Sequence, residues 1–191
     1  MYTFKNTKDG FKFLFDDGIY GEFAVFGESE IDGVTQAKGR IIWKHDQYHN
    51  DKIIEQKGEI PNLRKNQLDF SVNEALTNLY VGLLRVLRGE RLSGYRFIET
   101  YAFNNILSII HLTEIEENVT PDLFNIERRL EKRYPYFSLK LSTMLSGYDH
   151  LDQSAEAILN YLQQIYPLNQ RMKNEIEILI QKLRNKENNN D

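Results

Sequence analysis

The pattern of hydrophobic positions changes character near residue 60. Before that point the chain consists of short β-prone runs rich in Phe, Tyr, Ile, Gly and Asp. After Pro61, apolar residues recur at steps of three and four, as one face of a helix requires. We therefore expect an α+β fold, with a small antiparallel β-sheet of about three strands followed by a five- to six-helix bundle. The predicted boundaries are residues 1–60 for the sheet, 61–185 for the bundle and 186–191 for a disordered polar tail.

The clearest strand prediction is a hairpin around Asp17 and Gly18. Two β-prone runs, residues 11–15 and 19–26, flank this dipeptide. Asp-Gly favours a tight type I′ turn, because both central residues of that turn need a positive φ. Residues 39–44 form one more β-prone run and are predicted to be a further short strand.

Glu22 is the first candidate for chemistry in this hairpin. If Asp17 and Gly18 are the two loop residues, Glu22 lies opposite Phe13 and shares a face with Phe15 and Tyr20. A carboxylate on an aromatic face resists ionisation unless it is partnered, and poised carboxylates often transfer protons or bind metals. The alternative is a solvated glutamate on an open sheet edge.

The second part of the chain reads as successive helices. Ser71 and Glu74 are spaced as in a capping box at the start of the first helix, and Gly89 suits its C-terminal cap. Pro135 and Pro167 are expected to end the third and fifth helices. The predicted helices cover about residues 71–88, 93–114, 120–134, 136–146, 152–166 and 172–183.

Composition narrows the possible functions. The 24 basic and 28 acidic residues give a net charge of −4, so electrostatics does not favour nucleic acid as a partner. The chain has no cysteine, which excludes thiolate chemistry and Cys-bound zinc. No apolar run reaches the roughly 20 residues that span a bilayer, and the N-terminus does not resemble a signal peptide. We therefore expect a cytoplasmic protein without a membrane partner.

Few sequence motifs point to a ligand. The glycine-rich phosphate-binding motifs and the nucleophile elbow of hydrolases are absent. His45 and His49 are spaced by four residues, but their polar surroundings favour surface positions over a metal site. Residues 88–91, Arg-Gly-Glu-Arg, could bind phosphate or substrate; the alternative is a charged helix end capped by glycine.

Two segments together resemble a known enzyme family. Residues 15–23 resemble the last catalytic-strand region of lincosamide nucleotidyltransferases, which belong to the DNA polymerase β-like superfamily. Residues 76–114 are similar to the helical bundle that follows this strand in the family, and the resemblance covers roughly residues 5–115 in order and spacing. It implies the transfer of a nucleoside monophosphate from a nucleoside triphosphate to a hydroxyl of a small molecule, such as a lincosamide antibiotic, with Mg²⁺.

The resemblance also assigns roles to particular residues. Glu22 matches the third carboxylate of the family, which is the candidate general base and a candidate metal ligand. Arg88, Glu90 and Tyr101 lie in the helical part that corresponds to the substrate and dimerisation domain, and they are the candidate substrate-binding residues. A small-molecule substrate and a homodimer are the partners that we expect.

The chain departs from the family pattern upstream of Glu22. No Gly-Ser turn followed by Asp-x-Asp or Asp-x-Glu precedes this residue. Phosphoryl transfer depends on metal clamping of the triphosphate, so the isolated chain should bind magnesium nucleotide poorly and should be inactive. Residues 1–60 would then be the remnant of a catalytic sheet in part of a longer, truncated or split enzyme. The alternative is a non-catalytic helical interaction module, such as a partner or antidote protein.

Overall fold

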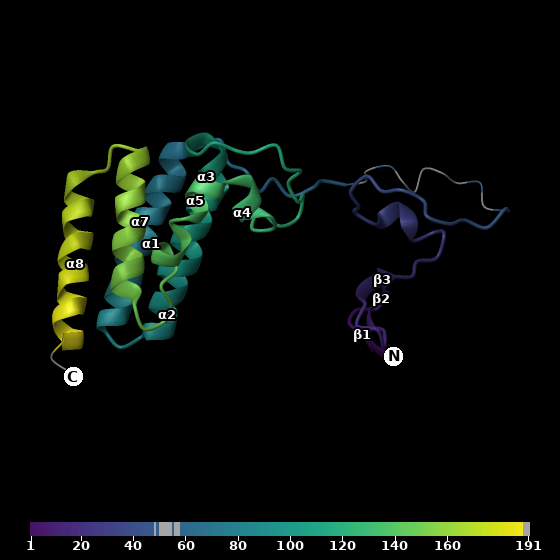
Figure 1. Cartoon of the computed structure of the whole chain (residues 1–191), viewed down its shortest axis with the longest axis horizontal. Coiled ribbons are helices and arrows are strands. Elements are labelled where there is room, and N and C mark those ends of the chain that lie inside the picture. The colour runs from purple at the N-terminus through teal and green to yellow at the C-terminus, as the bar shows by residue number, and fades with distance from the viewer. Residues whose placement is uncertain (48, 50–54, 56–57, 189–191) are drawn as a thin grey trace. The chain divides into compact units, whose positions relative to one another are not determined.

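The computed structural model describes residues 1–47, 49, 55 and 58–188. The chain divides into two compact units, Met1–Ile60 and Pro61–Asp191. The first unit contains an antiparallel three-stranded sheet and the second contains helices (Figure 1). The predicted α+β class is confirmed.

The sheet of the first unit has the strand order β1-β2-β3. Its strands are β1 (Tyr2–Lys5), β2 (Gly10–Leu14) and β3 (Tyr20–Ala24), and both pairings are antiparallel. The predicted hairpin forms from β2 and β3. The first strand was not foreseen from the sequence.

The turn of the hairpin differs from the expected two-residue type. The N–H of Phe15 donates to the carbonyl oxygen of Ile19 at 2.9 Å, so residues 16–18 form a three-residue loop. Gly18 has φ +86°, the left-handed conformation that such a loop needs at its last position. The longer loop shifts the register by one residue, and Glu22 pairs with Lys12 instead of Phe13.

The rest of the first unit has little regular structure. Residues 39–44 do not form the predicted strand, and a short 3₁₀ helix, η1 (Ile31–Gly33), is the other regular element of the described part. No described residue of Met1–Ile60 is buried, so this unit has no hydrophobic core of its own within the described part.

Four of the predicted helices are confirmed in the second unit. The first is α1 (Leu68–Leu87). The second is one continuous run in which α2, a π-helical segment and α3 follow one another without a break. The remaining bounds are α2 (Arg91–Tyr95), η3 (Arg96–Ala102), α3 (Phe103–Thr113), α7 (Leu151–Ile165) and α8 (Gln170–Asn188).

The ends of these helices follow the sequence signals only in part. Helix α1 begins at Leu68, so the expected capping box is wrong; Ser71 is buried in the first turn, with its hydroxyl 3.4 Å from that of Ser108. Gly89 does cap the C-terminus, with φ +89°. Helix α8 continues to Asn188, beyond the expected start of a tail at residue 186, and residues 189–191 lie outside the described range.

The segment between α3 and α7 contains short helices in place of the two predicted ones. They are α4 (Leu130–Arg133), α5 (Pro135–Ser138) and α6 (Leu141–Met144). Pro135 begins α5 at a position where its missing N–H costs nothing, instead of ending a long helix. The predicted helix 120–134 is therefore wrong except at its last turn.

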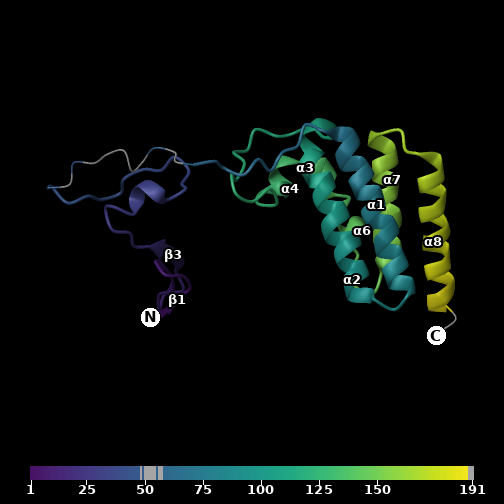
Figure 2. The same ribbon diagram turned by 180° about the vertical axis from the view of Figure 1, so that it is seen from behind.

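Helix α1 is the centre of the helical unit. It packs against η3, α2, α3, α7 and α8, and α1, α7 and α8 run side by side in both views (Figures 1 and 2). Its apolar face is fully buried at Val72, Leu76, Leu79 and Leu83, as the helical periodicity predicts. None of the described helices is long and apolar enough to cross a membrane.

Candidate functional site

Glu22 lies on the sheet face that carries Lys12 and Tyr20, and not opposite Phe13 as expected. Its side chain is 55% exposed and lies 3.3 Å from the ammonium of Lys12. The hydroxyl of Tyr20 donates a hydrogen bond to the same carboxylate. Phe11, Phe13 and Phe23 occupy the other face, where the rings of Phe11 and Phe23 stack with centroids 5.2 Å apart.

The surroundings of Glu22 favour its ionised form. The hydrogen bond from Tyr20 and then that from Lys12 lower the pKa of Glu22 below its ordinary value. Glu22 is thus a partnered carboxylate, and its cross-strand neighbours differ from the predicted ones because the turn has three loop residues. The role of Glu22 as general base or metal ligand stays a prediction.

The described residues do not fit a magnesium site at Glu22. Its carboxylate is already bound by Lys12 and Tyr20. Within the described part of the chain, no group of three or more His, Cys, Asp or Glu side chains is placed to hold a metal ion. His45 and His49 are both exposed, as the sequence predicts.

The helical unit brings two of the three predicted substrate-binding residues to one groove. Glu90 and Tyr101 both line it, while Arg88 lies beside it with its Nε donating to Glu90 at 3.0 Å. We call it the arginine groove; its volume is about 560 Å³. Its lining residues are Gly89, Glu90, Arg91, Leu92, Ser93, Arg96, Phe97, Tyr101 and Tyr148.

The charge around this groove is predominantly positive. Glu90 is hydrogen-bonded to Arg88 and lies 3.7 Å from Nη1 of Arg85. The hydrogen bond from Arg88 holds the pKa of Glu90 below its ordinary value. Arg91 and Arg96 line the groove itself. The carboxylate of Glu90 is thus paired with Arg88 and Arg85, and the groove lining contributes two further guanidinium groups.

One wall of the groove is held by contacts across the bundle. Arg91 donates from Nε to the carbonyl oxygen of Tyr148 at 2.8 Å and from Nη2 to that of Asp149 at 2.9 Å. Glu99, which is buried in η3, accepts the N–H of Gly147 at 2.8 Å and the hydroxyl of Ser154 at 2.6 Å. These bonds fix the loop that carries Tyr148 before any ligand arrives.

The aromatic side of the groove comes from η3. The guanidinium of Arg85 lies 4.6 Å from the ring centroid of Phe97, within cation–π range. Phe97 and Tyr101 meet edge to face, 5.2 Å apart, and Tyr101 is 46% exposed. The arrangement offers guanidinium groups for an anion and an aromatic face for a flat ring.

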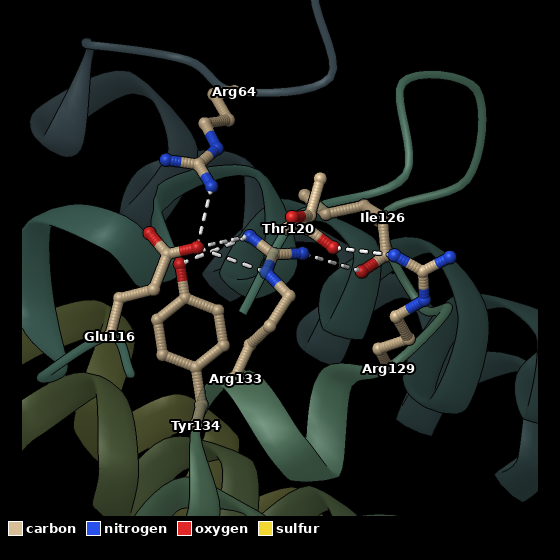
Figure 3. Close-up of polar contacts among 7 residues, drawn as sticks. All are labelled: Arg64, Glu116, Thr120, Ile126, Arg129, Arg133 and Tyr134. Carbon is tan, nitrogen blue, oxygen red and sulfur yellow. Dashed lines mark hydrogen bonds and ion pairs between the residues drawn. The ribbon is translucent and has the colours of Figure 1, made fainter. Parts of the chain in front are cut away.

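A buried charge network was missed by the sequence analysis. The side chain of Arg133 is only 1% exposed, and its Nε and Nη2 donate to Oε1 of Glu116 at 2.9 and 2.8 Å (Figure 3). The same oxygen accepts a bond from Nη2 of Arg64 at 2.7 Å. Glu116 lies 17 positions from Arg133 and 52 positions from Arg64 in the sequence, so no local pattern could pair these residues.

No protein-family model, curated protein or solved structure matches this chain. The resemblance to lincosamide nucleotidyltransferases therefore stays a prediction.

Proposed function

We propose that this chain acts in nucleotidyl transfer and that its arginine groove binds the nucleoside triphosphate. The observation that carries the proposal is the joint position of Arg96 and Tyr101 around one groove whose wall is held by Arg91. Guanidinium groups bind phosphate oxygens in a fork geometry, and an exposed aromatic ring can stack on a base. Both halves of a nucleotide would thus find a matching surface.

The other parts of the proposal follow from the resemblance. Glu22 would take the proton from the attacking hydroxyl of a small molecule, such as a lincosamide. The same proposal includes a homodimer in the cytoplasm. The dimer is supported by the edge strands β1 and β3, because an exposed strand edge is a ready surface for pairing.

Calorimetric titration of Mg²⁺-ATP into the full chain tests the proposed groove. We expect weak binding, with a dissociation constant on the order of 1 mM, since the residues that the structure describes form no metal clamp. Arg96→Ala and Tyr101→Ala should each weaken binding about five-fold or more, because one removes a phosphate contact and the other a stacking surface. Titrated separately, adenosine should report on stacking at Tyr101, and inorganic triphosphate should report on the phosphate contact of Arg96.

Arg171→Ala is the matched control, because Arg171 is exposed at the start of α8 and lies outside the groove. It removes the same charge and should leave binding unchanged. Equal weakening by Arg96→Ala and Arg171→Ala would show non-specific attraction and overturn the groove assignment. A wild-type chain that binds no nucleotide would overturn the proposal and favour the non-catalytic interaction module.

A further inference from the structure

A second pocket lies in the helical unit, with a volume of about 580 Å³. One wall is the segment that leads into α1, the floor is the start of α3 with the end of η3, and the other wall is the loop before α4. Only Tyr101 also lines the arginine groove. We call this second pocket the amide pocket. Its lining residues are Asn62, Leu63, Lys65, Tyr101, Asn104, Asn105, Ser108, Phe124, Asn125, Ile126 and Glu127.

The buried network of Arg133 joins the two walls of the amide pocket (Figure 3). Through Glu116, Arg133 is linked to Arg64, which lies within the first wall. Its Nη1 donates at 3.4 Å to the carbonyl oxygen of Ile126, which lies in the opposite wall. One guanidinium group, shielded from water, is thus bonded to one wall directly and to the other through Glu116.

Further bonds hold each wall separately. The N–H of Lys65 donates to the carbonyl oxygen of Ser108 at 2.7 Å, which ties the first wall to the floor. In the loop, a side-chain oxygen of Asp122 accepts the N–H groups of Phe124 and Asn125 at 2.9 and 3.0 Å. The walls are therefore preformed, which lowers the entropic cost of binding.

The asparagines of the pocket combine donors and acceptors. The side-chain oxygen of Asn125 accepts the N–H of Glu127 at 2.8 Å, which leaves its NH₂ group to donate. Asn105 donates from its NH₂ group to the carbonyl oxygen of Tyr101 at 2.9 Å, which leaves its oxygen to accept. A hydroxyl group is both donor and acceptor, so it matches such a surface better than an ion does.

The remaining lining favours a neutral ring compound. Lys65 and Glu127 contribute opposite charges, so the pocket has no surplus of either sign. Phe124 is 54% exposed and offers an apolar face on which the C–H side of a saturated ring can pack. The pocket volume lies in the range typical of small-molecule sites.

We propose that the amide pocket binds a neutral polyhydroxylated ring of the monosaccharide class, and that Arg133 and Glu116 are its positioning residues. This site goes beyond the proposed nucleotide groove. The proposal does not depend on nucleotidyl transfer, because the two sites can be tested separately. Asn104 and Phe124 line only the amide pocket, and Arg96 lines only the arginine groove.

Ligand-observed saturation-transfer NMR on the full chain tests the site with neutral monosaccharides and their methyl glycosides at millimolar concentration. At least one compound should receive saturation, and Asn104→Ala and Phe124→Ala should each weaken its binding five-fold or more. Asn160→Ala is the control, since Asn160 is exposed on α7 and does not line the pocket. Absence of transfer to every compound, or equal effects of all three variants, would overturn the proposal.

Arg133→Lys tests the positioning role, because it keeps the charge and loses the forked hydrogen bonds. It should weaken glycoside binding while Mg²⁺-ATP binding at the arginine groove stays unchanged. Unchanged glycoside affinity in a folded Arg133→Lys chain would refute the positioning role. If this variant does not fold, Asn104→Ala and Phe124→Ala still decide whether the pocket is a binding site.

Discussion

At the scale of single residues, the carboxylate of Glu116 is held by hydrogen bonds from two arginines. Partial burial alone would raise its pKa, but hydrogen bonds from Arg133, Arg64 and Tyr134 outweigh this effect and leave the pKa below its ordinary value. The pair with Arg133 is asymmetric, because Glu116 is 25% exposed and Arg133 is 1% exposed. Loss of the carboxylate would therefore leave a buried guanidinium without its counter-charge.

Glu116→Gln should lower the free energy of unfolding by about 3 kcal/mol, the lower part of the range for breaking a buried ion pair. Urea denaturation followed by circular dichroism at pH 7 measures this change. Glu117→Gln is the matched control, because Glu117 is exposed and only its backbone N–H bonds to Arg133. Similar losses in both variants would contradict the role given to the network.

The same pair of variants gives the pH dependence. Because the folded pKa of Glu116 is lowered, its contribution to stability is present above the unfolded pKa, near 4.5, and is lost as pH falls through the folded value. The difference in unfolding free energy between wild type and Glu116→Gln should therefore shrink below about pH 4.5. A difference that stays constant down to pH 3 would show that ionisation of Glu116 is not its source.

At the scale of elements, the close approach of α1 to the helical run 91–102 depends on two glycines. A Cβ on Gly82 would lie 2.7 Å from Cγ1 of Ile98. A Cβ on Gly94 would overlap Cγ2 of Val86 and lie 2.8 Å from the carbonyl oxygen of Gly82. The backbones meet here because neither residue has a side chain, and this contact places η3 and its Tyr101 beside α1.

Gly94→Ala should destabilise the helical unit by about 1–2 kcal/mol. Overpacking costs typically 1–3 kcal/mol, and the better helix propensity of alanine offsets about 1 kcal/mol of it. Thermal unfolding measured by calorimetry checks the value. Leu92→Ala, at a 64% exposed position two residues earlier, should change the stability by less than about 0.5 kcal/mol. A stabilised Gly94→Ala chain would show that the two helices can separate without cost.

The sequence predicted the elements whose stability comes from a long apolar face. Helices α1, α7 and α8 and the run 91–113 follow from periodicity alone, because each buries one stripe against its neighbours. The predicted helix 120–134 fails because the carboxylate of Asp122 binds two backbone N–H groups in a turn, and because Arg129 has a left-handed φ of +61°.

The candidate sites were predicted less well for a related reason. Glu90 and Tyr101 were named from the sequence, and the structure places both at one groove. The cross-strand partner predicted for Glu22 was wrong because a turn one residue longer moves every cross-strand pair by one position. The network of Arg64, Glu116 and Arg133 depends on tertiary contacts, for which a single sequence has no periodic signal.

At the scale of the whole molecule, the two units differ in how much apolar surface they bury. The helical unit contains every buried hydrophobic residue of the described chain, from Val72 to Leu183. In the sheet unit, large apolar side chains such as Tyr2, Phe23 and Trp43 are 47–78% exposed. Hydrophobic burial drives folding, so the two units should differ strongly in their stability as isolated chains.

We expect residues 61–191, expressed alone, to fold with the helical content and the cooperative unfolding of the full chain. The reason is that the buried hydrophobic residues and the ion pair of Arg133 with Glu116 all lie within this unit. Residues 1–60 alone should show no cooperative transition, since a three-stranded sheet without buried side chains cannot offset the entropy of ordering its backbone. Circular dichroism, thermal melts and amide hydrogen exchange on the two fragments measure this difference.

A cooperatively folding fragment 1–60 would contradict the argument by showing that its exposed aromatic faces are stabilised within the unit itself. A fragment 61–191 that fails to fold would contradict it from the other side, since the helical core would then depend on residues outside this unit.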